Sequence, residues 1–182
     1  MESRFTSFVG GPTGPWKIVS IKAISGTGLV HASHLELRDG LSDAEDVAWQ
    51  LRGVASNLRY TNEAERKALA AVQPGLGRPE ARCAALIPIR KTAAWWLLAQ
   101  DERRAIIEEQ SRHIAIGMAY LPAVARKLFH ARDLGEPFDF LTWFEFAPDH
   151  AARFDTLLAE LRASPEWDYV DREVEIRLER ER

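Results

Sequence analysis

The 182-residue chain contains a single cysteine, Cys83, which excludes an intramolecular disulfide and any cysteine-rich zinc site. It has no apolar run of about 18 residues, and its first residues carry neither the basic start nor the hydrophobic stretch of a secretion signal. Its 24 Lys and Arg residues are outnumbered by 27 Asp and Glu, so it lacks the basic excess of a general nucleic-acid-binding protein. We therefore expect a cytoplasmic protein with neither a membrane nor a nucleic acid as partner.

Catalytic motifs with a recognisable spacing are also missing. The five histidines form no His-Glu-x-x-His pair, and there is no glycine-rich phosphate loop and no Gly-x-Ser-x-Gly element. Cys83 lies in an apolar segment, which is typical of a small buried hydrophobe rather than a nucleophile. Common hydrolase, nucleotide-binding and zinc chemistries therefore find no support in the sequence.

The composition is that of a globular protein, with 46% hydrophobic and 28% charged residues. Proline and glycine gather in Gln73-Pro74-Gly75-Leu76-Gly77-Arg78-Pro79, which predicts a break in the chain. We place a boundary there, between an N-terminal half at residues 1–80 and a C-terminal half at residues 81–182.

Hydrophobic patterns predict the elements of both halves. The N-terminal half is expected to contain strands at residues 4–9, 16–24 and 45–60, a loop around His31 and His34, and a helix from the capping box Asn62-x-x-Glu65 to Val72. The C-terminal half is expected to contain strands at residues 83–89, 124–131, 139–146 and 168–178, with helices at 101–118 and from near Pro148.

The C-terminal order of strand, helix, strand, strand, helix, strand is that of a ferredoxin-like unit. Its helices cover only one face of the sheet, so the other face needs a partner. The strand-rich N-terminal half is the obvious candidate, and the two halves together could close a barrel.

Taken alone, individual residues leave the function open. His113 is followed one helical turn later by Gly117, which leaves room for a flat ligand, but the pattern taken alone favours an ordinary solvated or core histidine. Arg126 could be a surface charge on a strand. The six tryptophans suit an aromatic cavity or a normal core.

Several longer segments resemble the chlorite dismutases, in particular the short, dimeric, cytosolic branch of that haem protein family. These segments occur in the family's order and spacing: Gly10-Gly11-x-Thr13-Gly14-x-Trp16, Gln73 to Glu80, Ile87-Pro88-Ile89-Arg90-Lys91, Tyr120 to Arg126, and Arg132 to Phe140. The resemblance implies an α+β fold with two ferredoxin-like halves, whose antiparallel sheets form a dimeric α+β barrel. The N-terminal half would be reduced, because the longer pentameric members carry a fuller one.

The resemblance also implies roles for particular residues. His113 matches the proximal histidine that binds the iron of haem b, and Arg126 matches the distal catalytic arginine. Glu166 and Lys91 match the carboxylate and the lysine behind the proximal imidazole. Gln73 matches the glutamine that holds the distal arginine inward.

Five further residues are expected to contact the haem, namely Asn57, Tyr60, Trp95, Leu121 and Phe144. The implied reaction converts chlorite to chloride and dioxygen through a ferryl intermediate, with recombination of a retained chlorine oxide fragment. A homodimer with a role in detoxification is also implied. Two alternatives remain: a haem-binding or dimerising module without chlorite turnover, and a coproporphyrin decarboxylase-like relative, against which Arg126 counts.

Overall fold

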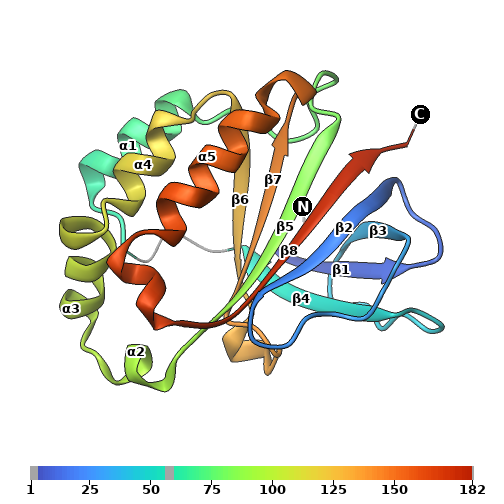
Figure 1. Cartoon of the computed structure of the whole chain (residues 1–182), viewed down its shortest axis with the longest axis horizontal. Coiled ribbons are helices and arrows are strands. Elements are labelled where there is room, and N and C mark those ends of the chain that lie inside the picture. Colours follow the sequence, from blue (N-terminus) through green and yellow to red (C-terminus); the bar gives the residue numbers. More distant parts are fainter. Residues whose placement is uncertain (1–3, 56–59, 182) are drawn as a thin grey trace.

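A computed structural model of the chain describes residues 4–55 and 60–181. The eight strands of this part form a closed, antiparallel barrel in the order β1-β3-β2-β8-β5-β7-β6-β4. The helices gather on one side of the barrel, against the strands of the C-terminal half (Figure 1). The predicted mixed α+β architecture with a barrel is therefore confirmed.

Strand positions agree with the sequence patterns except at two places. The strands are β1 (Phe5–Gly11), β2 (Trp16–Ser25), β3 (His34–Asp39), β4 (Trp49–Ala55), β5 (Cys83–Lys91), β6 (Val124–His130), β7 (Phe140–Phe146) and β8 (Val170–Arg180). The expected loop at His34 is wrong, because this residue begins β3. The six-residue pattern of β3 is weak, and its hydrogen bonding to β1 and burial of Leu35 decide the conformation. The predicted strand at 45–60 is shorter, and residues 56–59 lie outside the described part.

The predicted helices are present where a capping box or a long apolar stripe indicated them. The helices are α1 (Glu63–Val72), α2 (Ala93–Leu97), α3 (Gln100–Arg104), α4 (His113–Ala119) and α5 (Ala151–Arg162), with a π-helix at Ala105–Gln110. The Asn62–Glu65 capping box is present in both directions: the Asn62 side chain accepts from the Glu65 amide, and the Glu65 carboxylate accepts from the Asn62 amide. Helix α5 buries the predicted stripe Phe154, Leu157, Leu158 and Leu161.

The single helix predicted at residues 101–118 is wrong. The segment consists of α3, the π-helix and α4, with Arg112 at φ +52° between the last two. A left-handed residue that is not glycine is uncommon and needs support from its surroundings. The break places His113 at the start of α4.

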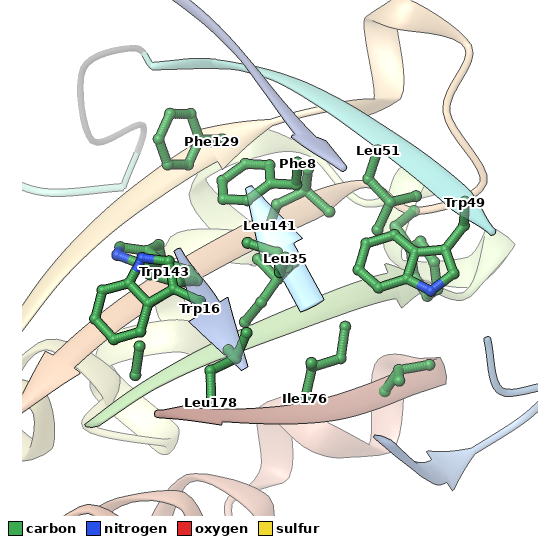
Figure 2. Packing of buried hydrophobic residues seen from close by; sticks show 14 of the residues in the cluster. Phe8, Trp16, Leu35, Trp49, Leu51, Phe129, Leu141, Trp143, Ile176 and Leu178 are labelled. Atoms are coloured by element: carbon green, nitrogen blue, oxygen red, sulfur yellow. The ribbon is translucent and has the colours of Figure 1, made fainter. Parts of the chain in front are cut away.

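The apolar residues form two layers, one on each face of the C-terminal sheet. Inside the barrel, Phe8, Trp16 and Trp143 pack with aliphatic side chains from both halves (Figure 2). On the outer face, Phe144, Phe146 and other residues of β5–β7 pack against α5. Alternate residues of each strand therefore face different environments.

Two strand pairs join the halves and close the barrel. Strand β2 pairs with β8, and β4 pairs with β6 at Val54–His130 and Ala55–Phe129. At the second seam Gly53 allows a close approach, since a Cβ there would lie 2.6 Å from Cβ of Phe129. Within residues 4–55 and 60–181, no helix combines the length and apolarity needed to cross a membrane.

Candidate active site

A cavity lies between the outer face of β5–β7 and the helices. It holds about 1190 Å³ of space, part of it open to solvent. The strands contribute Ile87, Ile89, Lys91, Val124, Arg126, Leu128, Phe140, Thr142 and Phe144 to its wall. The helices and connections contribute Tyr60, Thr61, Leu69, Trp95, Ile107, His113, Ile114, Gly117, Tyr120, Leu121, Leu157, Leu158, Leu161, Glu166 and Trp167. A largely apolar wall with few polar groups is typical of a cofactor or small-molecule site.

His113 belongs to a short chain of polar contacts at one end of this cavity. Its Nδ1 lies 2.6 Å from Oε2 of Glu166, and Lys91 Nζ donates to Oε1 of the same carboxylate at 2.7 Å. This contact holds the hydrogen on Nδ1 and leaves Nε2 as the nitrogen with a lone pair. The half-buried imidazole is therefore oriented as a metal ligand would be.

Glu166 is buried and yet ionised. Burial opposes ionisation, but the charge of the Lys91 ammonium and the hydrogen bonds from His113 and Lys91 outweigh it and lower the pKa of Glu166. The Lys91 ammonium lies 4.4 Å from the ring centroid of Trp95, which gives the buried cation a second favourable contact. The carboxylate is thus available as a hydrogen-bond acceptor over the whole neutral range.

The helix break before His113 is held by two polar side chains. Ser111 is buried, and its hydroxyl accepts the backbone N–H of Glu166 at 2.8 Å. The Glu108 carboxylate accepts the backbone N–H of Ile114 at 2.8 Å. The Glu108 contact satisfies an amide of the first turn of α4, and the Ser111 contact ties the helix break to Glu166, the carboxylate partner of His113.

Replacing Glu108 with alanine should lower the free energy of unfolding by about 0.5–2 kcal/mol, the usual range for a lost helix cap. Glu108→Gln should recover most of this loss, because its amide oxygen can accept the same hydrogen bond. Urea denaturation measures both effects. Glu109→Ala, at an exposed neighbouring position, is the control, and equal midpoints for Glu108→Ala and Glu109→Ala would contradict this account.

Arg126 reaches the same cavity from β6, where it pairs in register with Phe144 of β7. In the described part of the chain, no carboxylate lies within ion-pair distance of its guanidinium. Burial lowers the pKa of Arg126, and no acidic neighbour offsets that effect. A largely enclosed cation without a counter-charge is costly unless a ligand supplies one.

Gln73 does not line the cavity. Its Nε2 donates to the backbone carbonyl of Arg126 at 2.9 Å, so the contact involves the main chain rather than the guanidinium. Arg78 of the same segment donates to the carbonyl of Ala123. The Pro- and Gly-rich segment therefore fastens the beginning of β6, and direct support of the guanidinium by Gln73 stays a prediction.

Of the other predicted residues, Tyr60, Trp95, Leu121 and Phe144 line the cavity, and Asn57 lies outside the described residues. Trp95 is fully buried, and its Nε1 has no hydrogen-bond partner among residues 4–55 and 60–181. An orphaned donor beside a cavity is suited to an acceptor group on a ligand.

Sequence reasoning missed many of the aliphatic wall residues and Thr142. Their signal was available in the strand periodicity, because Phe140, Thr142 and Phe144 alternate with the barrel residues Leu141 and Trp143. Which of the two faces would border a cavity depends on the helices packed there, and the strand pattern does not contain that information.

The donor set excludes a site for a free metal ion built from side chains alone. Within residues 4–55 and 60–181, no group of three His, Cys, Asp or Glu side chains could hold one. A single oriented imidazole at the edge of an apolar cavity instead fits a metal whose other ligands belong to an organic cofactor. Gly117, where an added Cβ would meet nothing within 4 Å, keeps the helix face beside His113 open for a flat group.

Comparison with known proteins agrees with this geometry. The family model of chlorite dismutase matches residues 27–180. The dimeric chlorite dismutase of Nitrobacter winogradskyi is 57% identical, with a TM-score of 0.91 over 97% of this chain and 99% of that one. A mutant chlorite dismutase from Candidatus Nitrospira defluvii, at 20% identity and a TM-score of 0.67 over 100% of this chain and 93% of that one, shares the fold.

A curated relative, the chlorite dismutase of Ideonella dechloratans, is 30% identical over an alignment of 128 residues that covers 68% of this chain. This match covers 42% of that relative's length. Since the family model spans most of the sequence, and a closely similar structure carries the same barrel throughout, the chain belongs to the chlorite dismutase family.

Proposed function

We propose that this protein is a haem b enzyme that decomposes chlorite to chloride and dioxygen. The observation that carries the proposal is the pair of groups facing one apolar cavity: an imidazole oriented by a buried carboxylate, and an arginine that has no carboxylate partner within the described ranges. Family membership and the 57% identical chlorite dismutase support the same reaction.

The residues fit a haem. His113 would bind the iron through Nε2, and the aliphatic and aromatic side chains of the wall would contact the porphyrin. The unpaired Nε1 of Trp95 would find an acceptor in an acidic side group of the porphyrin. When bound, the haem would supply the redox-active iron at which the oxygen–chlorine bond of chlorite is broken.

Glu166 and Lys91 would control the donor strength of the imidazole. A carboxylate that accepts the Nδ1 hydrogen bond makes the ring a stronger electron donor and fixes its orientation. Lys91 restrains this effect, because it shares the same carboxylate at 2.7 Å. The arrangement favours oxidised iron while keeping Glu166 ionised and in place.

Arg126 would attract chlorite and retain the chlorine oxide fragment until it recombines. Arginine keeps its charge in proteins at working pH, so no proton is exchanged. At 4 Å a unit charge pair is worth on the order of 4 kcal/mol at an effective dielectric of about 20, against about 1 kcal/mol in water. Even after desolvation, this attraction favours recombination over escape.

The experiment that tests the proposal follows chlorite-driven dioxygen release with an oxygen electrode, using purified protein reconstituted with haem. We expect a one-to-one haem complex, and dioxygen formed in proportion to the chlorite consumed. Stable haem binding without dioxygen would favour the alternative of a binding module. Loss of carboxyl groups from added iron coproporphyrin would favour the decarboxylase-like alternative.

We also propose that the protein is a homodimer, as its 57% identical relative is described.

The strand order supports the proposal that each half is a ferredoxin-like unit. The C-terminal half runs β8-β5-β7-β6 and the N-terminal half β4-β1-β3-β2, so both place their fourth, first, third and second strands side by side. The N-terminal half has no helix between β1 and β2 or between β3 and β4, in keeping with a reduced unit. Location in the cytoplasm and a detoxifying role stay predictions.

A further inference from the structure

We propose that Thr142 is a second substrate-binding group, which donates a hydrogen bond from its hydroxyl to the oxyanion that Arg126 attracts. The proposal rests on the proposed function and adds a specificity-determining residue to it.

The strand register places Thr142 beside Arg126 on the cavity wall. Arg126 pairs with Phe144, and Leu128 pairs with Thr142, on the neighbouring strands β6 and β7. Thr142 is thus the diagonal neighbour of Arg126 on one face of the sheet, and such neighbours lie about 7–8 Å apart at the backbone. A small anion between the two side chains can contact both.

Thr142 is a polar residue between apolar cross-strand neighbours. Its cross-strand neighbours are Leu128 on one side and Ile87 on the other, and both line the same cavity. Among the described strand residues of the wall, the polar ones are Lys91, Arg126 and Thr142, and Lys91 is already paired with Glu166. Valine has nearly the same shape and would suit an apolar wall better.

Among residues 4–55 and 60–181, the hydroxyl of Thr142 makes no hydrogen bond, and the residue is half-buried in the cavity wall. Its O–H group is therefore available as a donor to a ligand. A ligand oxygen in the cavity can accept from it without displacing a hydrogen bond within the described residues.

The two groups complement each other chemically. The guanidinium supplies charge and several donors, whereas the hydroxyl supplies one directed donor that costs little to desolvate. Chlorite is bent and carries two terminal oxygens, so one oxygen can face Arg126 while the other accepts from Thr142. This arrangement selects small oxyanions over neutral molecules of similar size.

The test uses haem-reconstituted protein and nitrite, a bent oxyanion, titrated spectroscopically against parent, Thr142→Val and Thr142→Ser. We expect Thr142→Val to weaken nitrite binding and raise the KM for chlorite, each by about tenfold, as for a lost hydrogen bond to a charged group. Thr142→Ser should stay within about twofold of the parent. Carbon monoxide, a neutral ligand of the reduced protein, should bind all three equally.

Thr156→Val is the matched control, because its hydroxyl bonds to its own helix at the exposed Ala152 carbonyl. If the parent releases dioxygen from chlorite but Thr142→Val binds nitrite as tightly as Thr156→Val, the role of Thr142 is refuted and the proposed function stands. If the parent itself neither binds haem nor decomposes chlorite, the proposed function and the role of Thr142 fail together.

Discussion

His113→Ala should abolish stable haem binding. His113 is the imidazole that lines the cavity with a ring nitrogen free for a metal, and within the described residues no cluster of other donor side chains could replace it. Haem should then be retained only through contacts with the apolar wall, so its absorption band should shift and most of it should be lost on gel filtration. Haem content per chain and the absorption spectrum measure the effect.

The matched control is His31→Ala, which removes an exposed histidine outside the cavity wall. Its haem content and spectrum should equal those of the parent. Circular dichroism should show that both variants keep the fold, because His113 is half-buried and its removal leaves the barrel layers intact. Unchanged haem content and spectrum in His113→Ala would overturn its assignment as the iron ligand.

Arg126→Ala should keep haem but lose most of its chlorite turnovers. The guanidinium is a cation on the strand wall of the cavity, and, unlike Lys91, it has no carboxylate partner in the described part of the chain. Losing even half of an attraction of about 4 kcal/mol corresponds to more than about a tenfold change in retention. Released hypochlorite should then bleach the haem and end catalysis early.

Total dioxygen per chain and hypochlorite captured by a chlorination-sensitive dye provide the two readouts. Arg126→Lys keeps a positive charge and should fall between Arg126→Ala and the parent. Lys127→Ala, which removes the exposed cation next in sequence, should behave as the parent does. An Arg126→Ala protein with parental turnover number and no additional hypochlorite would remove the retention role from Arg126.

The sequence predictions were accurate where the pattern was local and inaccurate where distant residues decide the conformation. The strands at β5, β6 and β7, the capped helix α1 and the apolar stripe of α5 all arise from local patterns, and the structure contains each of them. The short strand β3 and the helix break before His113 were missed. Both depend on partners far away in the chain, β1 in the first case and Glu166 in the second.

The site residues that could be predicted from the sequence are the ones with distinctive side-chain chemistry. It singled out His113, Arg126, Glu166 and Lys91, and the structure brings all four to one cavity. The resemblance to a known family, rather than spacing alone, was needed to prefer these residues over ordinary core or surface ones. Gln73 shows the limit of this approach, because its contact is with the main chain of Arg126.

By itself, the amino-acid sequence determined the strands β5, β6 and β7, the helices α1 and α5, the break at residues 73–79, and the family. The tertiary structure decided how the barrel closes and which face of the sheet borders the cavity. It also decided that, among the described residues, the guanidinium of Arg126 has no counter-charge and the hydroxyl of Thr142 no hydrogen bond. The physical reason is that periodicity encodes which residues share a face. What covers that face, and whether a polar group finds a partner there, depends on residues brought together only by folding.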